Sequence, residues 1–323
     1  MVQINSVLGP VDTADLGFTL IHEHLLIGWT GWSWDQKAVF DRKQEMAKAI
    51  DMLQELRALG VRTFVDPCPM DIGRDPEFMA EASERSGMTI IGSTGLYHGV
   101  MGIPAYYHGL AEEEIAEIFI ADITGGMAST SIKAGIIKNA TNAGVVTEQE
   151  QKVHLASGRA QVATGAPIIT HTDEAGPMGL AQLDLYESRG VKTNRVAIGH
   201  SCGNGDIRYL LSVLARGAYL SFDRFGFGIS ASDDVRIAAL LGLIGLGHAD
   251  RVMLGHDSVS TFLGRGFNPP PEIAAQLANW HPTHLIKNIF PRLKEAGVSQ
   301  DTIDTMMISN PRNYFEGTIA AAK

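Results

Sequence analysis

Cysteine is nearly absent from this sequence of 323 residues, in which only Cys68 and Cys202 occur. Such sparse usage excludes a disulfide-stapled fold and is typical of reducing compartments, where thiols stay free. The first twelve residues also lack the basic and apolar regions of a signal peptide. We therefore expect two free thiols and a cytoplasmic protein.

Long apolar runs and excess positive charge are missing as well. No uninterrupted apolar stretch approaches the roughly 20 residues that a membrane span needs. The formal net charge is −10, and the resulting field repels phosphate backbones and anionic membranes. Neither nucleic acid nor a membrane is an expected partner.

The composition that remains is that of a globular protein. Hydrophobic residues make up 45% and charged residues 19% of the chain, which is enough to fill a large core. No Pro/Ser-rich linker or charge run divides the sequence. We expect one domain over residues 1–323.

Short apolar or β-branched runs alternate with longer stretches of helical period along the chain. The predicted strands are 17–21, 61–66, 88–94, 131–138, 167–171, 195–200, 218–223 and 251–257. The predicted helices between and after them are 41–59, 76–86, 111–125, 148–164, 178–189, 206–216 and 234–245. Eight such units favour a closed (β/α)8 TIM barrel over an open doubly wound sheet. The glycines at 242–247 end a helix and precede a strand, which is the wrong order for a nucleotide fingerprint.

The segment after the eighth strand has a different character. Residues 258–282 show no clear periodicity and contain three consecutive prolines, so we expect a long irregular loop. Its apolar side chains, among them Phe262 and Trp280, predict a lid or a cover over the barrel top. Two further helices are expected at 283–296 and 300–309.

Polar side chains stand where several predicted strands end, and in a barrel these ends form the active face. His22 and His24 close the first strand, His171 the fifth, His200 the sixth and Asp257 the eighth. Each alone is as readily a polar residue at the end of a buried strand. Together they predict a divalent metal site, because imidazole and carboxylate are common metal ligands.

Lys138 ends the fourth predicted strand, with Ala134 and Ile136 on the same face. A buried ammonium is unfavourable, so two chemical roles remain open. The amine acts as a neutral Schiff-base nucleophile, or CO2 caps it to give an anionic carbamate that bridges two metals. Four neighbouring histidine ligands favour the carbamate.

The sequence resembles the phosphotriesterase-like lactonases of the amidohydrolase superfamily, relatives of bacterial phosphotriesterase. The matching words are LGFTLIHEH at 16–24, VD at 65–66, DIGRD at 71–75, TGLY at 94–97, KAGIIK at 133–138, THT at 170–172, IGH at 198–200, DRFG at 223–226, HD at 256–257 and NP at 310–311. They span nearly the whole chain in order.

The resemblance implies two divalent metals, with zinc the first expectation and cobalt, manganese or iron as alternatives. His22, His24 and Asp257 would bind the more buried metal, and His171 and His200 the more exposed one. An N6-carboxylated Lys138 and a hydroxide would bridge them. Asp257 would accept the hydroxide proton, Tyr97 would border the site, and Arg224 would shape the substrate pocket. The resemblance also suggests a homodimer.

One departure concerns residue 203. Relatives of this kind place a proton-relaying aspartate three residues after the sixth-strand histidine, and here that residue is Gly203. A lactone keeps its leaving group tethered, so solvent or Asp257 alone could protonate it.

The expected substrate is a small lactone or ester. Phe225, Phe262 and Trp280, together with Tyr97 and Arg224, are the expected contacts of an N-acyl homoserine lactone or another hydrophobic lactone, which would make the protein quorum-quenching. Phosphotriesters and aryl esters are expected side substrates. A dedicated phosphotriesterase or carboxylesterase, a Schiff-base lyase using Lys138, and a non-catalytic metal-binding protein are the alternatives.

Overall fold

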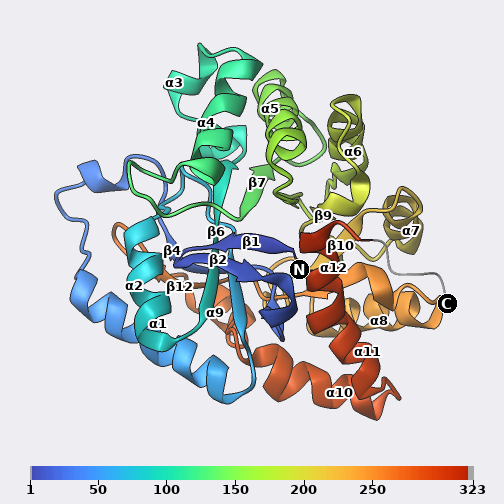
Figure 1. Ribbon diagram of the computed structural model, residues 1–323. Coiled ribbons are helices and arrows are strands. Elements are labelled where there is room, and N and C mark those ends of the chain that lie inside the picture. Colours follow the sequence, from blue (N-terminus) through green and yellow to red (C-terminus); the bar gives the residue numbers. More distant parts are fainter. Residues whose placement is uncertain (1, 319–323) are drawn as a thin grey trace.

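Eight parallel strands curl into a nearly closed barrel in the computed structural model of the protein, which describes residues 2–318 (Figure 1). In sheet order from the first strand they are β3 (Thr19–Leu20), β5 (Thr63–Asp66), β6 (Thr89–Leu96), β7 (Ile136–Ala140), β8 (Ile168–His171), β9 (Val196–Ile198), β10 (Tyr219–Phe222) and β11 (Val252–Leu254). Neighbouring strands in space are also neighbours in sequence. The predicted barrel fold is confirmed.

Helices follow the strands and surround the barrel, as Figure 1 shows. They are α1 (Arg42–Ala58), α2 (Pro76–Ser86), α4 (Glu112–Thr124), α5 (Glu148–Thr164), α6 (Gly179–Ser188), α7 (Ile207–Ala215) and α8 (Asp233–Gly245). Local sequence sets their ends: Asp41 and Asp75 accept hydrogen bonds from the first backbone N–H groups of α1 and α2. Thr147 and Glu150 form a capping box that starts α5.

The barrel closes between its first and last strands through only a few contacts. The N–H of Ile21 donates to the carbonyl of Leu254 at 3.3 Å, and the N–H of Asp257 donates to the carbonyl of His22 at 2.9 Å. Beyond this point β4 (Glu23–Ile27) pairs in parallel with β12 (Ser258–Phe262). The seam of the barrel therefore runs directly past two of the predicted metal ligands.

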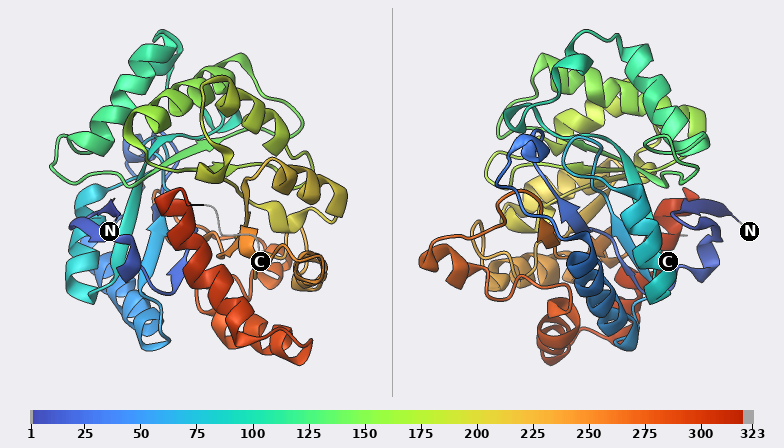
Figure 2. Two further views of the ribbon diagram at one scale, coloured as in Figure 1. Left: turned by 45° about the vertical axis from the view of Figure 1, so that its right-hand side comes forward. Right: turned by 90° about the vertical axis from the view of Figure 1, so that its left-hand side faces the viewer.

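One side chain from each strand fills the barrel interior. The fully buried cluster comprises Ile21, Val65, Ile91, Ile136, Ile169, Ala197, Tyr219 and Met253, with Leu16, Tyr314 and Phe315 beside them. The hairpin of β1 (Gln3–Ser6) and β2 (Gly9–Asp12) covers one end of the barrel with α12 (Asn310–Glu316). In the right-hand view of Figure 2 this hairpin and α9 (Pro271–Gln276) lie at opposite ends of the molecule. The hairpin therefore covers this end of the barrel, and we expect the functional site at the opposite end.

Several elements differ from the sequence-based expectation. The prediction of an irregular segment over 258–282 is wrong in part, because it contains β12 and α9. β12 gains its hydrogen bonds from β4, a pairing between distant segments that local periodicity does not reveal. The hairpin β1–β2 and the short α3 (Ala105–His108) were not expected.

The two expected C-terminal helices are present with altered bounds. The first consists of a π-helical turn at Leu285–Ile289 and α10 (Phe290–Glu295). The second runs from α11 (Gln300–Asp304) through a π-helical turn at Thr305–Ser309 into α12. The expected domain ends, residues 1 and 323, lie outside the described residues.

Both cysteines are buried and free, as expected. Among residues 2–318, no helix combines the length and apolar character needed to cross a membrane.

His154 lies on the buried face of α5 against the ring of Tyr186. Its Nδ1 lies 2.8 Å from the carbonyl of Glu150, and its Nε2 has no partner among the described residues. Burial is the largest influence on this imidazole and lowers its pKa to about 4. The folded protein therefore holds His154 neutral.

Because the folded-state pKa of His154 lies below the ordinary value, the unfolded chain binds the proton first as the pH falls. Stability from this residue should be lost between about pH 6.5 and 4, by about 2 kcal/mol between pH 7 and 5. Urea unfolding at both pH values should show a smaller pH dependence for His154→Gln than for the wild type. The exposed His108, changed to Gln, is the control; equal pH dependence in all three proteins would contradict the assignment.

Candidate active site

A pocket of about 250 Å³ opens at the carboxyl ends of the strands, away from the hairpin. All six predicted ligands line it: His22, His24, Lys138, His171, His200 and Asp257. They come from five different strands or strand ends, spread over most of the sequence. Tyr97, Arg224, Phe262 and Trp280 line the same pocket.

Two of these residues adopt a left-handed backbone conformation. His200 has φ 55° and Asp257 has φ 52°, which is uncommon for residues with a side chain. Ala197 faces the barrel interior, so continued alternation along β9 would point His200 outward. The turn in the backbone brings its imidazole into the pocket instead. Such strain is typical of functional sites.

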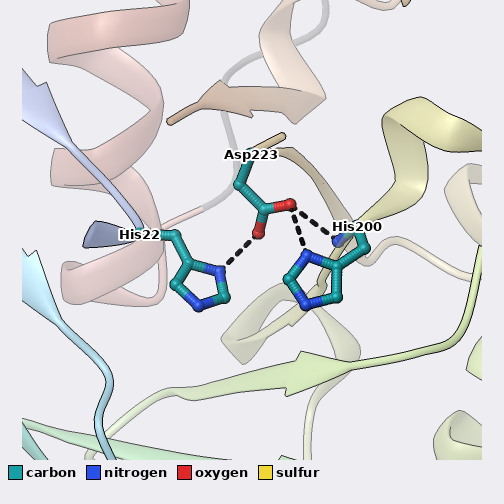
Figure 3. Close-up of side chains that lie close together, drawn as sticks. All are labelled: His22, His200 and Asp223. Atoms are coloured by element: carbon teal, nitrogen blue, oxygen red, sulfur yellow. Dashed lines mark hydrogen bonds and ion pairs between the residues drawn. The ribbon is translucent and has the colours of Figure 1, made fainter. Parts of the chain in front are cut away.

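The histidine rings are held by buried carboxylates behind them. Figure 3 shows Asp223 between His22 and His200, with dashed lines to both rings. Its Oδ2 lies 2.6 Å from Nδ1 of His22, and its Oδ1 lies 2.9 Å from Nδ1 of His200. Asp66 does the same for His24, with Oδ1 at 3.1 Å from Nδ1. A carboxylate at Nδ1 fixes the tautomer that leaves Nε2 with its lone pair.

The free ring nitrogens converge on a small volume. Nε2 of His22 and Nε2 of His24 lie 3.3 and 3.1 Å from Oδ1 of Asp257. Nε2 of His200 lies 2.8 Å from Nδ1 of His171. Such short contacts are favourable when a proton or a cation lies between the two atoms.

Lys138 places its ammonium nitrogen 3.0 Å from Nε2 of His22. Burial is the largest influence on it and lowers its pKa to about 8. Gly95 on β6 is paired with Lys138 in the sheet, and a Cβ there would lie 1.9 Å from the Lys138 carbonyl oxygen. Only glycine lets the two strands approach at this point.

Asp257 connects the ligand group with the pocket wall. Its Oδ2 accepts a 3.0 Å hydrogen bond from Nε of Arg224, while Oδ1 faces the histidines. Tyr97 lies opposite, with its hydroxyl 3.1 Å from Nδ1 of His171, and its backbone N–H donates to Asp71. The pocket thus holds one hydroxyl and one guanidinium beside the converging ligands.

The rest of the pocket is apolar. Its walls include Trp29, Phe227, Phe262, Phe267 and Trp280. Phe225, expected to contact substrate, is fully buried in the core and does not line the pocket. Arg224 and Phe227, which lie on either side of it in the turn after β10, line the pocket instead.

Sequence reasoning missed the supporting carboxylates. Asp66 and Asp223 also stand at strand ends, so the rule that selected the six ligands could have found them. Trp29 and Phe227 lie in loops without periodicity and gave no comparable signal. Glu174 also escaped notice, although it is buried beside the pocket.

The family model described as the phosphotriesterase family matches residues 2–315. The chain belongs to the phosphotriesterase family. A phosphotriesterase homology protein of Mycobacterium tuberculosis is 36% identical, over 98% of both chains. An aryldialkylphosphatase of Saccharolobus solfataricus is 32% identical, over 94% of this chain and 96% of that one.

Solved structures agree with this family membership. The organophosphorus hydrolase from Deinococcus radiodurans superposes with a TM-score of 0.94 at 37% identity, covering 97% of this chain and 96% of that one. A mutant described as a PTE-like lactonase from the same organism gives 0.94 at 36% identity, over 97% of this chain and 99% of that one. This phosphotriesterase-family protein is a metal-dependent hydrolase that acts on esters.

The donor set of this phosphotriesterase-family chain fits metal ions. Ligand atoms of His22, His24 and Asp257 lie within 4.8 Å of one another, as do those of His22, His200 and Asp223. In the second group the Nδ1 atoms are already occupied by Asp223, so this carboxylate belongs behind the ligands. Neutral imidazole nitrogens and a carboxylate are the donors that zinc-like ions take.

We expect Asp223→Asn to weaken metal binding about 10- to 100-fold, because an amide can accept from one histidine Nδ1 only. Competition with a chromogenic chelator measures this change. Asp184→Asn, which alters an exposed carboxylate paired with Arg216, is the control. Metal retention equal to the wild type in the Asp223 variant would refute the role given to this carboxylate.

Proposed function

We propose that the chain opens N-acyl homoserine lactones or other hydrophobic lactones at a binuclear metal centre. The observation that carries the proposal is that one pocket contains both metal-compatible donors and an apolar wall. Six metal-compatible donors lie at its floor, and five aromatic side chains form its walls. Phosphotriesters and aryl esters are slower substrates in this proposal.

His22, His24 and Asp257 would hold one metal, and His171 and His200 the other. Lys138, carboxylated on its amine, would bridge the two. Support comes from the ring orientations: Nε2 of His22 and of His24 faces Asp257, and Nε2 of His200 faces Nδ1 of His171. Zinc is proposed first among the divalent metals that such donors accept, with cobalt, manganese or iron as alternatives.

When bound, such a metal pair polarises the ester oxygen and makes hydroxide available near neutral pH. The chain itself has to move a proton and hold the substrate. Asp257 offers Oδ2 toward the pocket, beside Arg224, and is the proposed proton acceptor. The Tyr97 hydroxyl and the Arg224 guanidinium are the proposed donors that orient the substrate carbonyl.

The preference for lactones rests on the apolar wall and on the leaving group. An acyl chain buries itself against aromatic side chains, with about 0.8 kcal/mol gained per CH2 group. The alkoxide of an opened lactone stays tethered to the product and needs no separate leaving-group site. A phosphotriester has a detached leaving group, which makes it the weaker candidate.

The test measures kcat/KM on N-acyl homoserine lactones of increasing chain length, beside an aryl ester and a phosphotriester. We expect close to two divalent ions per chain, loss of activity with chelators, and a rise of about three- to fourfold in kcat/KM per CH2 until the pocket is full. A flat response to chain length, or higher kcat/KM on the phosphotriester, would contradict the lactone proposal.

The same panel separates the rival functions. A Schiff-base lyase would leave a covalent adduct on Lys138 after borohydride treatment with substrate, whereas our proposal expects none. A non-catalytic metal-binding protein would contain metal and turn over none of the panel.

We also propose a cytoplasmic homodimer. The side chains of Trp34, Val39, Val100 and Tyr106 are exposed, and a dimer interface that includes Trp34 would cover apolar surface. Light scattering should give twice the mass of one chain, and Trp34→Glu should shift the protein toward monomer. A monomeric wild type would disprove this assembly.

A further inference from the structure

The space beside Gly203 is filled by another residue. Gly203 ends the short helical turn Ser201–Gly203 after His200, and its φ lies outside the left-handed region, so its backbone could carry any side chain. A Cβ at this position would lie 2.0 Å from Oε1 and 2.1 Å from Cδ of Glu174. The carboxylate of Glu174 therefore stands where a side chain at residue 203 would begin.

Glu174 is a buried anion between two arginines. Its side chain is 4% exposed, and its Oε1 accepts a 2.7 Å hydrogen bond from Arg236, which is fully buried on α8. Its Oε2 lies 3.5 Å from Nη1 of Arg224, whose Nε lies 3.0 Å from Oδ2 of Asp257. Alternating charges thus run from the pocket floor into the core, in the order Asp257, Arg224, Glu174 and Arg236.

Arg236 has further partners that hold it without Glu174. It donates to the carbonyl of Phe227 and to the hydroxyl of Ser230, and its Nη1 lies 2.9 Å from Sγ of Cys202. Within residues 2–318, the side-chain hydrogen bonds of Arg224 go to Asp257 and Glu174 only, and its guanidinium lies 5.0 Å from the centre of the Phe227 ring. Among the described residues, Glu174 is consequently the one anion besides Asp257 that holds Arg224 through a hydrogen bond.

We infer that Glu174 is a positioning residue, which holds the Arg224 guanidinium against Oδ2 of Asp257 and takes over the space and the negative charge of a carboxylate at residue 203. It acts through Arg224 and does not touch the proposed ligand atoms. The inference rests on the proposed function for its kinetic consequence, but its structural consequence is independent of any substrate.

The first test replaces Glu174 by Gln, which keeps the volume and removes the charge. We expect kcat/KM on the best substrate to fall about 10- to 100-fold, with the loss mainly in kcat, while metal content stays near the wild type. The melting temperature should fall, because the buried Arg236 loses its anionic partner. Glu174→Asp should recover part of the activity. Glu81→Gln is the matched control, because Glu81 also bridges two arginines, Arg42 and Arg85, but on the exposed surface.

A second test exchanges the two positions. Glu174→Gly alone should lose activity. Gly203→Asp alone should be inactive or unfolded, since the new side chain meets the Glu174 carboxylate. The double variant, Glu174→Gly with Gly203→Asp, should regain at least tenfold over Glu174→Gly, because a carboxylate returns to the same space.

A third test measures the position of Arg224 in crystal structures and does not depend on enzymatic activity. In crystals of Glu174→Gln the Arg224 guanidinium should have left Asp257, whereas wild type and Glu81→Gln should keep the contact. Arg224 remaining at Asp257 in Glu174→Gln would overturn the inference, as would unchanged kcat/KM in an active enzyme. Failure of the proposed function would show separately, as a wild type that turns over no lactone or ester.

Discussion

The architecture of the site depends on carboxylates that are buried behind histidines. Asp223, following β10, holds the rings of His22 and His200, which come from the first and sixth strands. Asp66, ending β5, holds His24. Without these anions the imidazoles could rotate, or could turn Nδ1 rather than Nε2 toward the pocket. The barrel brings the strand ends together, and the carboxylates orient the histidine rings so that their Nε2 atoms point into the pocket.

Much of the fold and the general location of the site could be predicted from the sequence. Alternating apolar runs and helical periods are local properties, and the end of a buried strand is visible as a polar residue after β-branched ones. His171 and Lys138 follow this rule, since each continues the inward face of its strand beyond Ile169 and Ile136. The hydrogen-bond register of parallel strands then brings these ends together.

The remaining features depend on contacts between distant segments. The pairing of β4 with β12 and the π-helical turns near the C-terminus leave no local signature. The left-handed turn at His200 reverses the direction that strand alternation assigns to its side chain. Phe225 shows the same limit, since it lies in a turn after β10, where the directions of successive side chains follow no period that the sequence reveals. Glu174 was invisible because its importance comes from the absence of a side chain at Gly203, 29 residues later in the chain.

The seam between the first and eighth strands determines when the donor residues can assemble during synthesis and folding of the chain. His22 follows the first strand and Asp257 the last, and the backbone bond between them helps to close the ring. A nascent chain therefore carries most of the donor residues long before it can assemble them, because Asp257 follows all eight barrel strands in the sequence. The donor set becomes whole in the same event that joins the first and eighth strands. A chain that ends before Asp257 therefore lacks the carboxylate that faces His22 and His24, although His171 and His200 can already meet on neighbouring strands.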